Sequence, residues 1–254
     1  MSSESRQNLQ AGPWDWLLNK FNNFHMCGFI KRVTDRPAYR ALIKQLGWDD
    51  LLAGDDVGLQ QFYPAFGGDS SRQIKGLVIE EGGHTRAVNA TWWFDCKEEG
   101  DQLVVGKRTT FNARNLDSPF WKGALRHHRG IVVATGIGES KVIEGKKHQF
   151  LMESETPFLL GALYRWFPAG HYSCAVITRD EHPKFTPYHE KAFPLFLPID
   201  RDFLDTWLDP DITQADVIDE LLTRPRLYTD LQVQEVKSYK GAIPIGSSRS
   251  ISAD

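Results

Sequence analysis

Residues 131–139 have the sequence IVVATGIGE, and the pattern in this stretch decides the fold. The apolar run Ile131–Ala134 is typical of a buried strand, and two glycines follow it before Glu139. Similar apolar runs recur on both sides, with Gly, Asp and Glu clusters between them. Because these strands do not alternate with long helices, we expect a mixed, mainly antiparallel α+β domain rather than a doubly wound one.

The expected elements cover most of the chain. The other predicted strands are Cys27–Ile30, Lys75–Ile79, Ala87–Phe94, Leu103–Lys107, Gln149–Met152, Phe158–Leu163, Tyr172–Thr178, Leu195–Leu197 and Leu231–Val236. One predicted helix is capped by Asp35, has Pro37 in its first turn and ends before Gly47. The other predicted helices run from Ser118-Pro119 to His128, over Asp202–Leu208 and over Gln214–Leu222.

Composition bounds the class of protein. The chain has 254 residues, of which 41% are hydrophobic and 25% charged, and its formal net charge is -3. These values are typical of one globular domain and allow a local basic groove, but not a surface coated with nucleic acid. The sequence has no apolar run of about eighteen residues and no secretory signal, so we expect a cytoplasmic protein. Three cysteines without a CxxC motif predict neither a disulfide scaffold nor a zinc site.

Both ends are expected to lie outside the domain. Residues 1–26 form an N-terminal extension, a possible leader or propeptide, with aromatic and apolar residues at helical spacing after Pro13. The Gly/Ser-rich residues 241–254 predict a mobile C-terminal tail. The domain is then expected over residues 27–240.

Cys27 is the candidate nucleophile. It follows Met26, and an initiator methionine is removed when the next residue is as small as cysteine. The product would carry an α-amine and a thiol on adjacent carbons. Such an amine, with a pKa of about 8, condenses with an aldehyde to a Schiff base, and the thiol then closes a thiazolidine ring. A lone cysteine at a strand start is also typical of an inert core residue, so both interpretations stay open.

Four polar residues next to apolar segments could assist this chemistry. Asn112 and Arg114 lie in the motif NAR, Glu139 follows two glycines, and His189 lies in a loop before an apolar strand. A glutamate at a strand end can act as a general acid or base, and a histidine titrates in a range that suits proton transfer. Taken singly, each is equally typical of a solvated turn or edge.

The order of the motifs carries more information than any one of them. Along the chain they are Met26-Cys27-Gly28, Pro64, Trp92-Trp93, Asn112-Ala113-Arg114, Gly136-Ile137-Gly138-Glu139, Gly161-Ala162-Leu163-Tyr164, Tyr172–Thr178 and Tyr188-His189-Glu190-Lys191 before Pro194. This ordered set, over residues 26 to 208, resembles the SRAP family (SOS response-associated peptidase). Members of that family crosslink their own cysteine to abasic sites in single-stranded DNA.

The resemblance implies a single SRAP-like domain, barrel-like and mainly antiparallel, with peripheral helices. It also implies catalytic roles. Cys27 would bond to the ring-opened sugar, and Asn112 would hold the cysteine and the sugar. Glu139 and His189 would transfer protons, and His189 would also contact the lesion phosphate.

The resemblance further implies how DNA would be bound. Arg114 and Lys191 would contact phosphates, which position a strand without reading its sequence. Trp92 or Trp93, together with Pro64, would offer apolar surfaces to the flanking bases or backbone. The implied partner is single-stranded DNA with abasic sites, bound by a monomer, with no membrane contact and with nucleoid association in a bacterium. No metal or organic cofactor is expected.

Several positions depart from the family pattern. Phe29 stands where the family has an arginine, and Leu116 where it has a glutamate. Gly138 and Ser140 replace an aromatic residue and a tryptophan on either side of the glutamate, and Ala192-Phe193 replace an arginine and a methionine. The sequence therefore indicates a divergent member.

The largest departure is the segment before Cys27, since a cysteine blocked by an amide cannot form a thiazolidine. Translation could start at Met26, proteolysis could remove residues 1–26, or the extension could stay and Cys27 could have lost the crosslinking role. Two other functions stay open. One is a cysteine peptidase with Cys27 as nucleophile, His189 as base and Asn112 as orienting group. The other is a non-catalytic single-stranded DNA-binding protein, for which a basic cluster is available in Lys122, Arg126, His127, His128 and Arg129.

Overall fold

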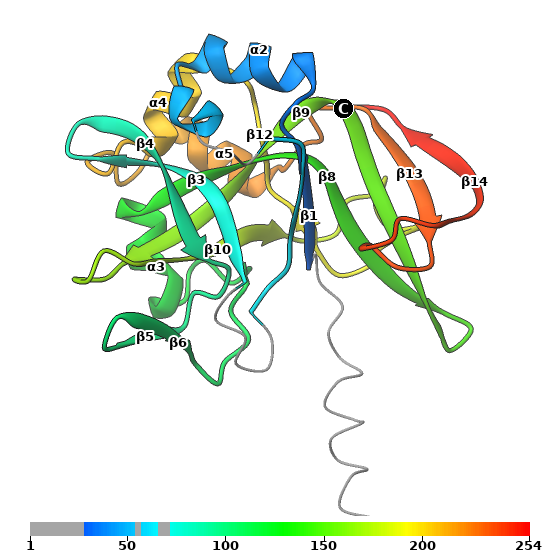
Figure 1. The fold of residues 1–254 in the computed structure, drawn as a ribbon, viewed down its shortest axis with the longest axis horizontal. Helices are drawn as coiled ribbons and strands as arrows, with labels where there is room; N and C mark the ends of the chain where they lie inside the picture. The colour runs from blue at the N-terminus through cyan, green and yellow to red at the C-terminus, as the bar shows by residue number, and fades with distance from the viewer. Residues whose placement is uncertain (1–27, 54–56, 66–71) are drawn as a thin grey trace, which may run out of the picture.

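Strands dominate the chain, as the computed structural model shows for residues 28–53, 57–65 and 72–254. The N-terminal extension and Cys27 lie outside these described residues. The single domain with its helices at the periphery confirms the predicted α+β class (Figure 1).

Five strands close into a barrel. In order around the ring they are β9 (Lys146–Trp166), β10 (Tyr172–Arg179), β4 (His84–Thr91), β3 (Gln73–Glu81) and β8 (Arg129–Ile143). β8 pairs with β9 and closes the ring, and all neighbours are antiparallel except β10 and β4. Closure leaves no free edge within the ring, which protects its backbone groups.

The hairpin β8–β9 contributes the two longest strands of the barrel. Glu144 and Gly145 connect the two strands with positive φ values of 50° and 76°, the conformation of a two-residue type I′ turn. The sequence predicted separate strands at Ile131–Ala134, Gln149–Met152 and Phe158–Leu163. The strands instead run on through the glycines, because both are paired along almost their whole length.

Further strands extend the sheet on both sides of the barrel. On one side, β1 (Phe29–Val33) pairs with β8 and with β2 (Leu59–Phe62). On the other, β13 (Leu231–Val236) pairs with β9 and with β14 (Pro244–Ile251). The predicted mobile tail is therefore wrong for most of its length, because cross-strand pairing with β13 orders the Gly/Ser-rich segment.

The helices are short and cover the barrel from outside. They are α2 (Pro37–Leu46), the 3₁₀ turn η1 (Asp49–Leu52), α3 (Pro119–His127), α4 (Arg201–Leu208) and α5 (Asp216–Thr223). α2, α4 and α5 lie along the upper side of the barrel in Figure 1. The N-cap of α2 is Arg36 rather than the predicted Asp35, whereas Gly47 ends the helix in the left-handed conformation as its type favours. None of the helices in the described part of the chain has the length and apolar character needed to cross a bilayer.

Short strands complete the structure. They are β5 (Cys96–Glu99), β6 (Gln102–Val105), β7 (Asn112–Ala113), β11 (Phe193–Pro194) and β12 (Phe196–Leu197). One apolar core fills the barrel and a second lies between the barrel and the helices. The alternation of side chains along each strand divides the residues of β8 and β9 between these two cores.

Candidate active site

Two buried titratable residues meet beside the barrel wall. Glu139 of β8 is 0% exposed, and His189, from the loop between β10 and β11, is 1% exposed. The Glu139 Oε2 and His189 Nδ1 atoms lie 3.4 Å apart, and the same nitrogen lies 3.1 Å from the carbonyl oxygen of Ser140. Charges are rarely buried without a partner, so this proximity makes the pair a strong candidate for proton transfer.

Glu139 is a strand residue and not a strand-end residue. It pairs with Phe150 of β9, four residues before β8 ends. Lys141, two residues further, points to the same side because side chains alternate along a strand. Its Nζ donates to the carbonyl oxygen of Thr186 (2.9 Å) and pairs with Glu190 (2.6 Å). The hydrogen bond and charge of Lys141 hold the pKa of the exposed Glu190 carboxyl below its usual value.

Local backbone bonds fold the loop that carries His189. The carbonyl oxygen of Phe185 accepts from the backbone N–H groups of both Tyr188 and His189, each at 2.8 Å. The ring of Tyr188 packs edge-on against Phe150, with centroids 5.1 Å apart. Phe150 of β9 therefore pairs with Glu139 through its backbone and packs against Tyr188, the residue before His189, through its ring.

Asn112 comes from a separate element. The two-residue strand β7 pairs in parallel with β10, and Asn112 lies opposite Val176. Its side chain is buried, 6% exposed. The neighbouring carbonyl oxygen of Phe111 accepts from the Val176 N–H (3.0 Å) and from the Trp92 indole N–H (2.8 Å), which fixes the backbone before Asn112.

The start of β1 lies beside Glu139. Phe29 pairs with Gly138, the residue before the glutamate. Cys27 is joined to this pair through Gly28 alone. The order of strands thus brings the first described residues after Cys27 next to the Glu139–His189 pair.

An aromatic group covers the start of β1. The ring of Tyr239, in the turn between β13 and β14, stacks on Phe29 with centroids 5.0 Å apart and planes at 14°. The Tyr239 hydroxyl donates to the carbonyl oxygen of Glu139 at 2.6 Å. A Cβ at Gly138 would lie only 2.7 Å from this ring, so the glycine is what permits the contact. The ring of Tyr63 also packs against Phe29, with centroids 5.2 Å apart.

The two residues predicted to bind phosphate lie at the surface. Arg114 follows β7 and pairs with Asp180 across 3.1 Å, with 44% and 89% of the two side chains exposed. Lys191 is exposed beside His189. An exposed ion pair contributes little stability, so Arg114 can exchange Asp180 for another anion at low cost.

The three residues expected to offer apolar surfaces to DNA are instead buried. Trp92 is 0% exposed and Trp93 6%, and both rings pack against Phe111. Pro64 is also buried. Their apolar side chains fill the core, and this burial contradicts the predicted exposed surfaces.

Arg129 is buried, so it cannot form part of the predicted basic cluster on the surface. It is 2% exposed, and its guanidinium donates to backbone carbonyl oxygens at the ends of α3 and α4. These acceptors are in Leu125, Arg126, Thr206, Trp207, Asp209 and Ile212. Arg129 therefore ties two helix ends together and is not available to a ligand.

The two described cysteines, Cys96 and Cys174, are core residues. Burial raises the pKa of the Cys96 thiol to about 12 and also raises that of Cys174. Neither forms a thiolate readily at neutral pH. Within the described ranges, no group of His, Cys, Asp and Glu side chains is arranged to hold a metal ion.

The sequence predicted Glu139, His189 and Asn112 as site residues but did not point to Lys141 and Tyr239. Lys141 had a signal, because the strand period of two puts it on the face of Glu139. Tyr239 had none, because only the fold of the β13–β14 turn carries it to β8. The buried Glu139–His189 pair can transfer protons out of contact with bulk water, close to Phe29, which follows Cys27 by two residues.

The chain is similar to known proteins in its structure and in its sequence. No curated protein sequence matches the chain. A phage-related protein and a second protein, both from Bordetella bronchiseptica, have similar structures, each with TM-score 0.58 and 18% identity. The matches cover 86% and 84% of this chain, respectively, and 100% of each Bordetella chain. A protein from Bacteroides thetaiotaomicron follows with TM-score 0.54 and 17% identity, over 82% of this chain and 92% of its own.

These structural similarities show the fold alone, because the identities are low. The sequence itself gives the stronger result. The family model described as SOS response associated peptidase (SRAP) matches residues 26–241, and the chain therefore belongs to the SRAP family.

Proposed function

We propose that this protein forms a covalent crosslink to abasic sites in single-stranded DNA through Cys27, once the α-amine of Cys27 is free. Membership of a family named for the SOS response supports a function associated with DNA damage. The observation that carries the proposal is the buried Glu139–His189 pair beside Phe29, two residues after Cys27.

The reaction balances without a cofactor. The amine nitrogen of Cys27 adds to the aldehyde carbon of the ring-opened sugar, and loss of one water gives a Schiff base. The thiol sulfur then adds to the same carbon and its proton passes to the nitrogen, which closes a thiazolidine ring. Ring opening, loss of water and ring closure each move a proton, which is the step that a buried acid/base pair accelerates.

The described residues suit distinct roles in this scheme. Glu139 transfers the proton during sugar ring opening, and His189 transfers the second proton near the lesion phosphate. Asn112 holds the cysteine and the sugar with its amide. Arg114 and Lys191, both exposed, contact the phosphates on either side.

Cleavage of the Met26–Cys27 bond is a second candidate activity, compatible with the first. The family is described as a peptidase, and in this chain Cys27 follows Met26. Hydrolysis of that bond, or a start of translation at Met26, frees the amine that the crosslink needs. A chain that keeps residues 1–26 is left with reversible DNA binding alone.

Intact mass spectrometry tests the proposal. Protein expressed from its own gene is weighed before and after incubation with single-stranded DNA that carries one abasic site. The expected result is a mass beginning at Cys27 that gains one DNA strand, with no gain in Cys27→Ala or with undamaged DNA. Cys96→Ala is the matched control, since its thiol is buried, and it should still form the adduct. A mass beginning at Met1 with no adduct contradicts the crosslinking function.

A further inference from the structure

The C-terminal hairpin β13–β14 contacts Glu139 at its turn, and the residues that follow β14 contact the loop that carries His189. Its strands lie outside the barrel, and β14 pairs only with β13 among the described strands. Registers connect Glu139 to Phe150 of β9 and Phe150 to Glu235 of β13. The hairpin is thus two strands away from Glu139 through the sheet, but its turn folds back over β8.

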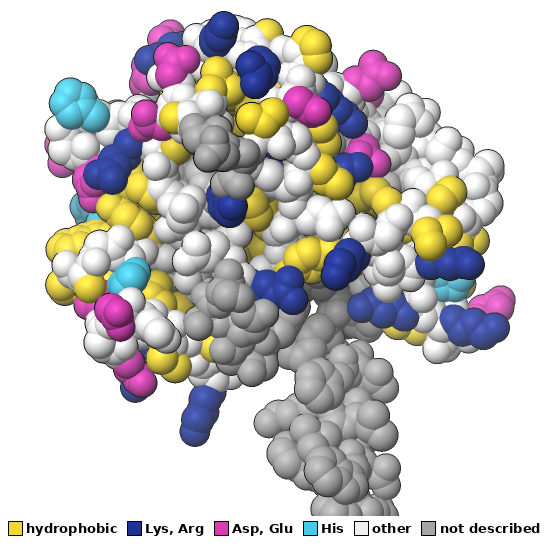
Figure 2. Space-filling view, viewed as in Figure 1, with side chains coloured by type: hydrophobic (Ala, Val, Ile, Leu, Met, Phe, Trp, Pro, Cys, Tyr) yellow, Lys and Arg dark blue, Asp and Glu magenta, His cyan; other side chains and the backbone are white. Residues whose placement is uncertain are grey.

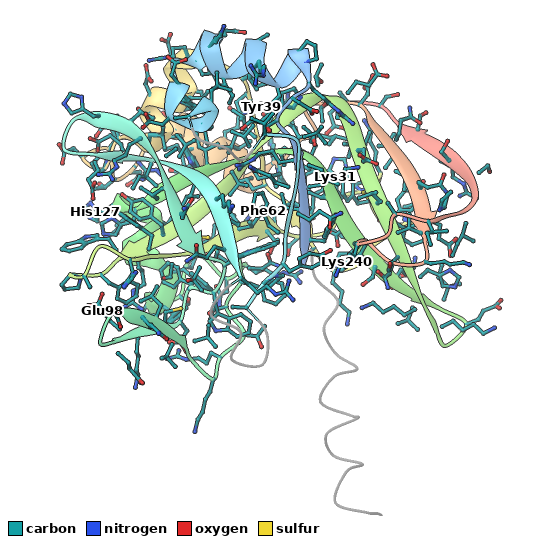
Figure 3. All side chains as sticks on the ribbon, in the orientation of Figure 1. Lys31, Tyr39, Phe62, Glu98, His127 and Lys240 are labelled. Atoms are coloured by element: carbon teal, nitrogen blue, oxygen red, sulfur yellow. The ribbon has the colours of Figure 1, made fainter. Side chains whose placement is uncertain are left out.

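At the turn, Tyr239 binds the backbone of Glu139 directly. Its hydroxyl donates to the Glu139 carbonyl oxygen at 2.6 Å, and its ring lies over Gly138 and stacks on Phe29. The backbone of Lys240 also contacts β2, through the Gln61 amide at 3.5 Å. Figure 3 shows Lys240 beside the lower end of β1, and in Figure 2 Lys and Arg side chains gather on the same part of the surface.

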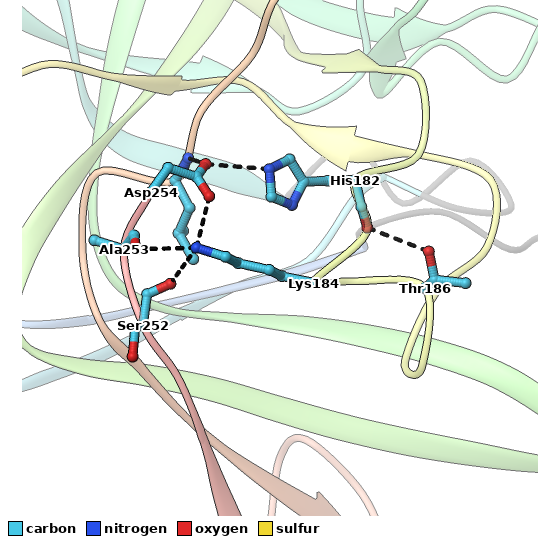
Figure 4. A network of polar contacts seen from close by, with 7 residues as sticks. His182, Lys184, Thr186, Ser252, Ala253 and Asp254 are labelled. Atoms are coloured by element: carbon cyan, nitrogen blue, oxygen red, sulfur yellow. Dashed lines mark hydrogen bonds and ion pairs between the residues drawn. The ribbon is translucent and has the colours of Figure 1, made fainter.

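At the other end, Asp254 binds the loop that leads to His189. Its carboxylate pairs with Lys184 at 2.6 Å and with His182 at 3.1 Å, and it also accepts from the Leu227 N–H at 2.7 Å (Figure 4). Lys184 Nζ further donates to the carbonyl oxygens of Ser252 and Ala253, both at 2.9 Å.

Two consecutive turns connect this anchor to His189. The His182 carbonyl oxygen accepts from the N–H groups of Phe185 (2.8 Å) and Thr186 (3.1 Å). The Phe185 carbonyl oxygen in turn accepts from the His189 N–H. Two turns closed by backbone hydrogen bonds therefore connect His182, which Asp254 binds, to His189.

From these contacts we propose that the C-terminal hairpin sets the geometry of the Glu139–His189 pair. Tyr239 is the positioning residue for Glu139, and Asp254 is the positioning residue for His189. The inference rests on the proposed function for the reaction that it affects, although the geometry itself can be measured without any reaction.

The test compares Tyr239→Phe and Asp254→Asn with matched controls, each expressed from the protein's own gene as in the crosslinking experiment. Tyr239→Phe removes only the hydroxyl that binds the Glu139 carbonyl, and its control is Tyr172→Phe, which also removes one tyrosine hydroxyl bond, the one to Glu81. Asp254→Asn keeps the size and removes the charge, and its control is the exposed Asp211→Asn. Circular dichroism and thermal melting confirm that each variant is folded.

Two measurements are made on every variant. One is the rate of adduct formation with abasic single-stranded DNA as a function of pH, with DNA affinity measured separately. The other is the NMR titration of the His189 imidazole in the absence of DNA. Among the described residues, the charged groups that face this imidazole include Glu139 from β8 and Glu190 from its own loop, and Lys141 of β8 is paired with Glu190.

The expected result is a rate about 10- to 100-fold lower in both variants, because small misplacements of acid/base groups are costly. DNA affinity should stay within about twofold. The His189 titration midpoint should move to lower pH, since a more distant carboxylate stabilises the imidazolium less. Both controls should match the unchanged protein.

Unchanged rate profiles and unchanged His189 titrations in both variants would overturn the inference. If the unchanged protein forms no adduct, the proposed crosslinking function fails, and the titration alone then decides on the hairpin. A shifted midpoint in Tyr239→Phe would support positioning in that case, and an unshifted one would refute it.

Discussion

Two departures from the family pattern are explained by one contact at the residue scale. Phe29 stands where an arginine was expected and Gly138 where an aromatic residue was expected. The ring of Tyr239 occupies the space that a side chain at position 138 would need, and it stacks on Phe29. Because Phe29, Gly138 and Tyr239 contact one another, the effects of substitutions at these positions on stability should not be additive.

This packing predicts that alanine substitution changes stability in opposite directions at two glycines. A Cβ at Gly138 would lie 2.7 Å from the Tyr239 ring and 2.9 Å from Phe29 Cβ, whereas a Cβ at Gly123 in α3 has no atom within 4 Å. Gly138→Ala should lower the free energy of unfolding by about 1 to 3 kcal/mol through overpacking. Gly123→Ala should raise it by about 0.5 to 1 kcal/mol through helix propensity. Urea denaturation of the two variants checks this, and equal effects would refute the packing described for Tyr239.

Glu139 supports a second prediction at this scale. Glu139→Gln keeps the shape of the side chain but removes its ability to accept a proton. The rate of adduct formation should fall by about 10²-fold or more, with DNA affinity almost unchanged. Time courses with abasic single-stranded DNA measure the rate, and the exposed Glu155→Gln is the control. A wild-type rate in Glu139→Gln would exclude Glu139 as the acid/base group.

At the scale of elements, the order of the C-terminal segment comes from pairing and not from composition. Its glycines and serines favour disorder, yet β14 forms because β13 offers a paired edge, and Asp254 then closes its end. The same holds for β8, in which Gly136 and Gly138 lie inside a strand rather than ending it. Cross-strand pairing outweighs local propensity at these positions.

The Asp254 anchor predicts a pH dependence of stability. Burial raises the pKa of Asp254, but the hydrogen bonds from Lys184 and the Leu227 N–H, with the charges of His182 and Lys184, outweigh it and hold the pKa below the usual value. A lowered folded-state pKa means that the stabilisation is complete above the unfolded value of about 3.9 and is lost as pH falls through the folded value.

Asp254→Asn should therefore be less stable than the unchanged protein at pH 7, and the difference should shrink as the pH falls below about 4. Thermal melting across this pH range measures the difference. A constant difference from neutral to acid pH would show that the charge of Asp254 is not what stabilises the end of β14.

At the scale of the whole molecule, affinity for DNA has to come from a few local contacts. The net charge is -3, so long-range attraction is weak. Lys191 is exposed two residues after His189 and Arg114 is exposed two residues after Asn112, while Arg129, part of the predicted cluster, is enclosed between helix ends. A small number of phosphate contacts is therefore expected.

This arrangement predicts a shallow salt dependence. Each phosphate contact to single-stranded DNA contributes a slope of about 0.7 in a plot of log affinity against log salt concentration. Arg114→Ala should reduce the slope by about that amount, as should Lys191→Ala, while the exposed Lys97→Ala should leave it unchanged. Fluorescence anisotropy at several salt concentrations measures the slopes, and equal slopes in all the variants would remove Arg114 and Lys191 from the DNA contacts.

The fold class, most of the strands and helices, and the candidate residues Asn112, Glu139 and His189 could be predicted from the sequence alone. Local rules suffice for the strands and helices, because their patterns lie within short stretches. The candidate residues needed the order of motifs along residues 26 to 208. It also determined the family, which the match over residues 26–241 confirms.

Which of these residues meet and which are buried depends on how the chain folds. The 3.4 Å approach of Glu139 and His189, the burial of Trp92 and Arg129, and the reach of Tyr239 to β8 all depend on barrel closure and strand order. No local pattern encodes these facts, because each joins segments far apart in the chain that meet only when the sheet closes and its cores are filled.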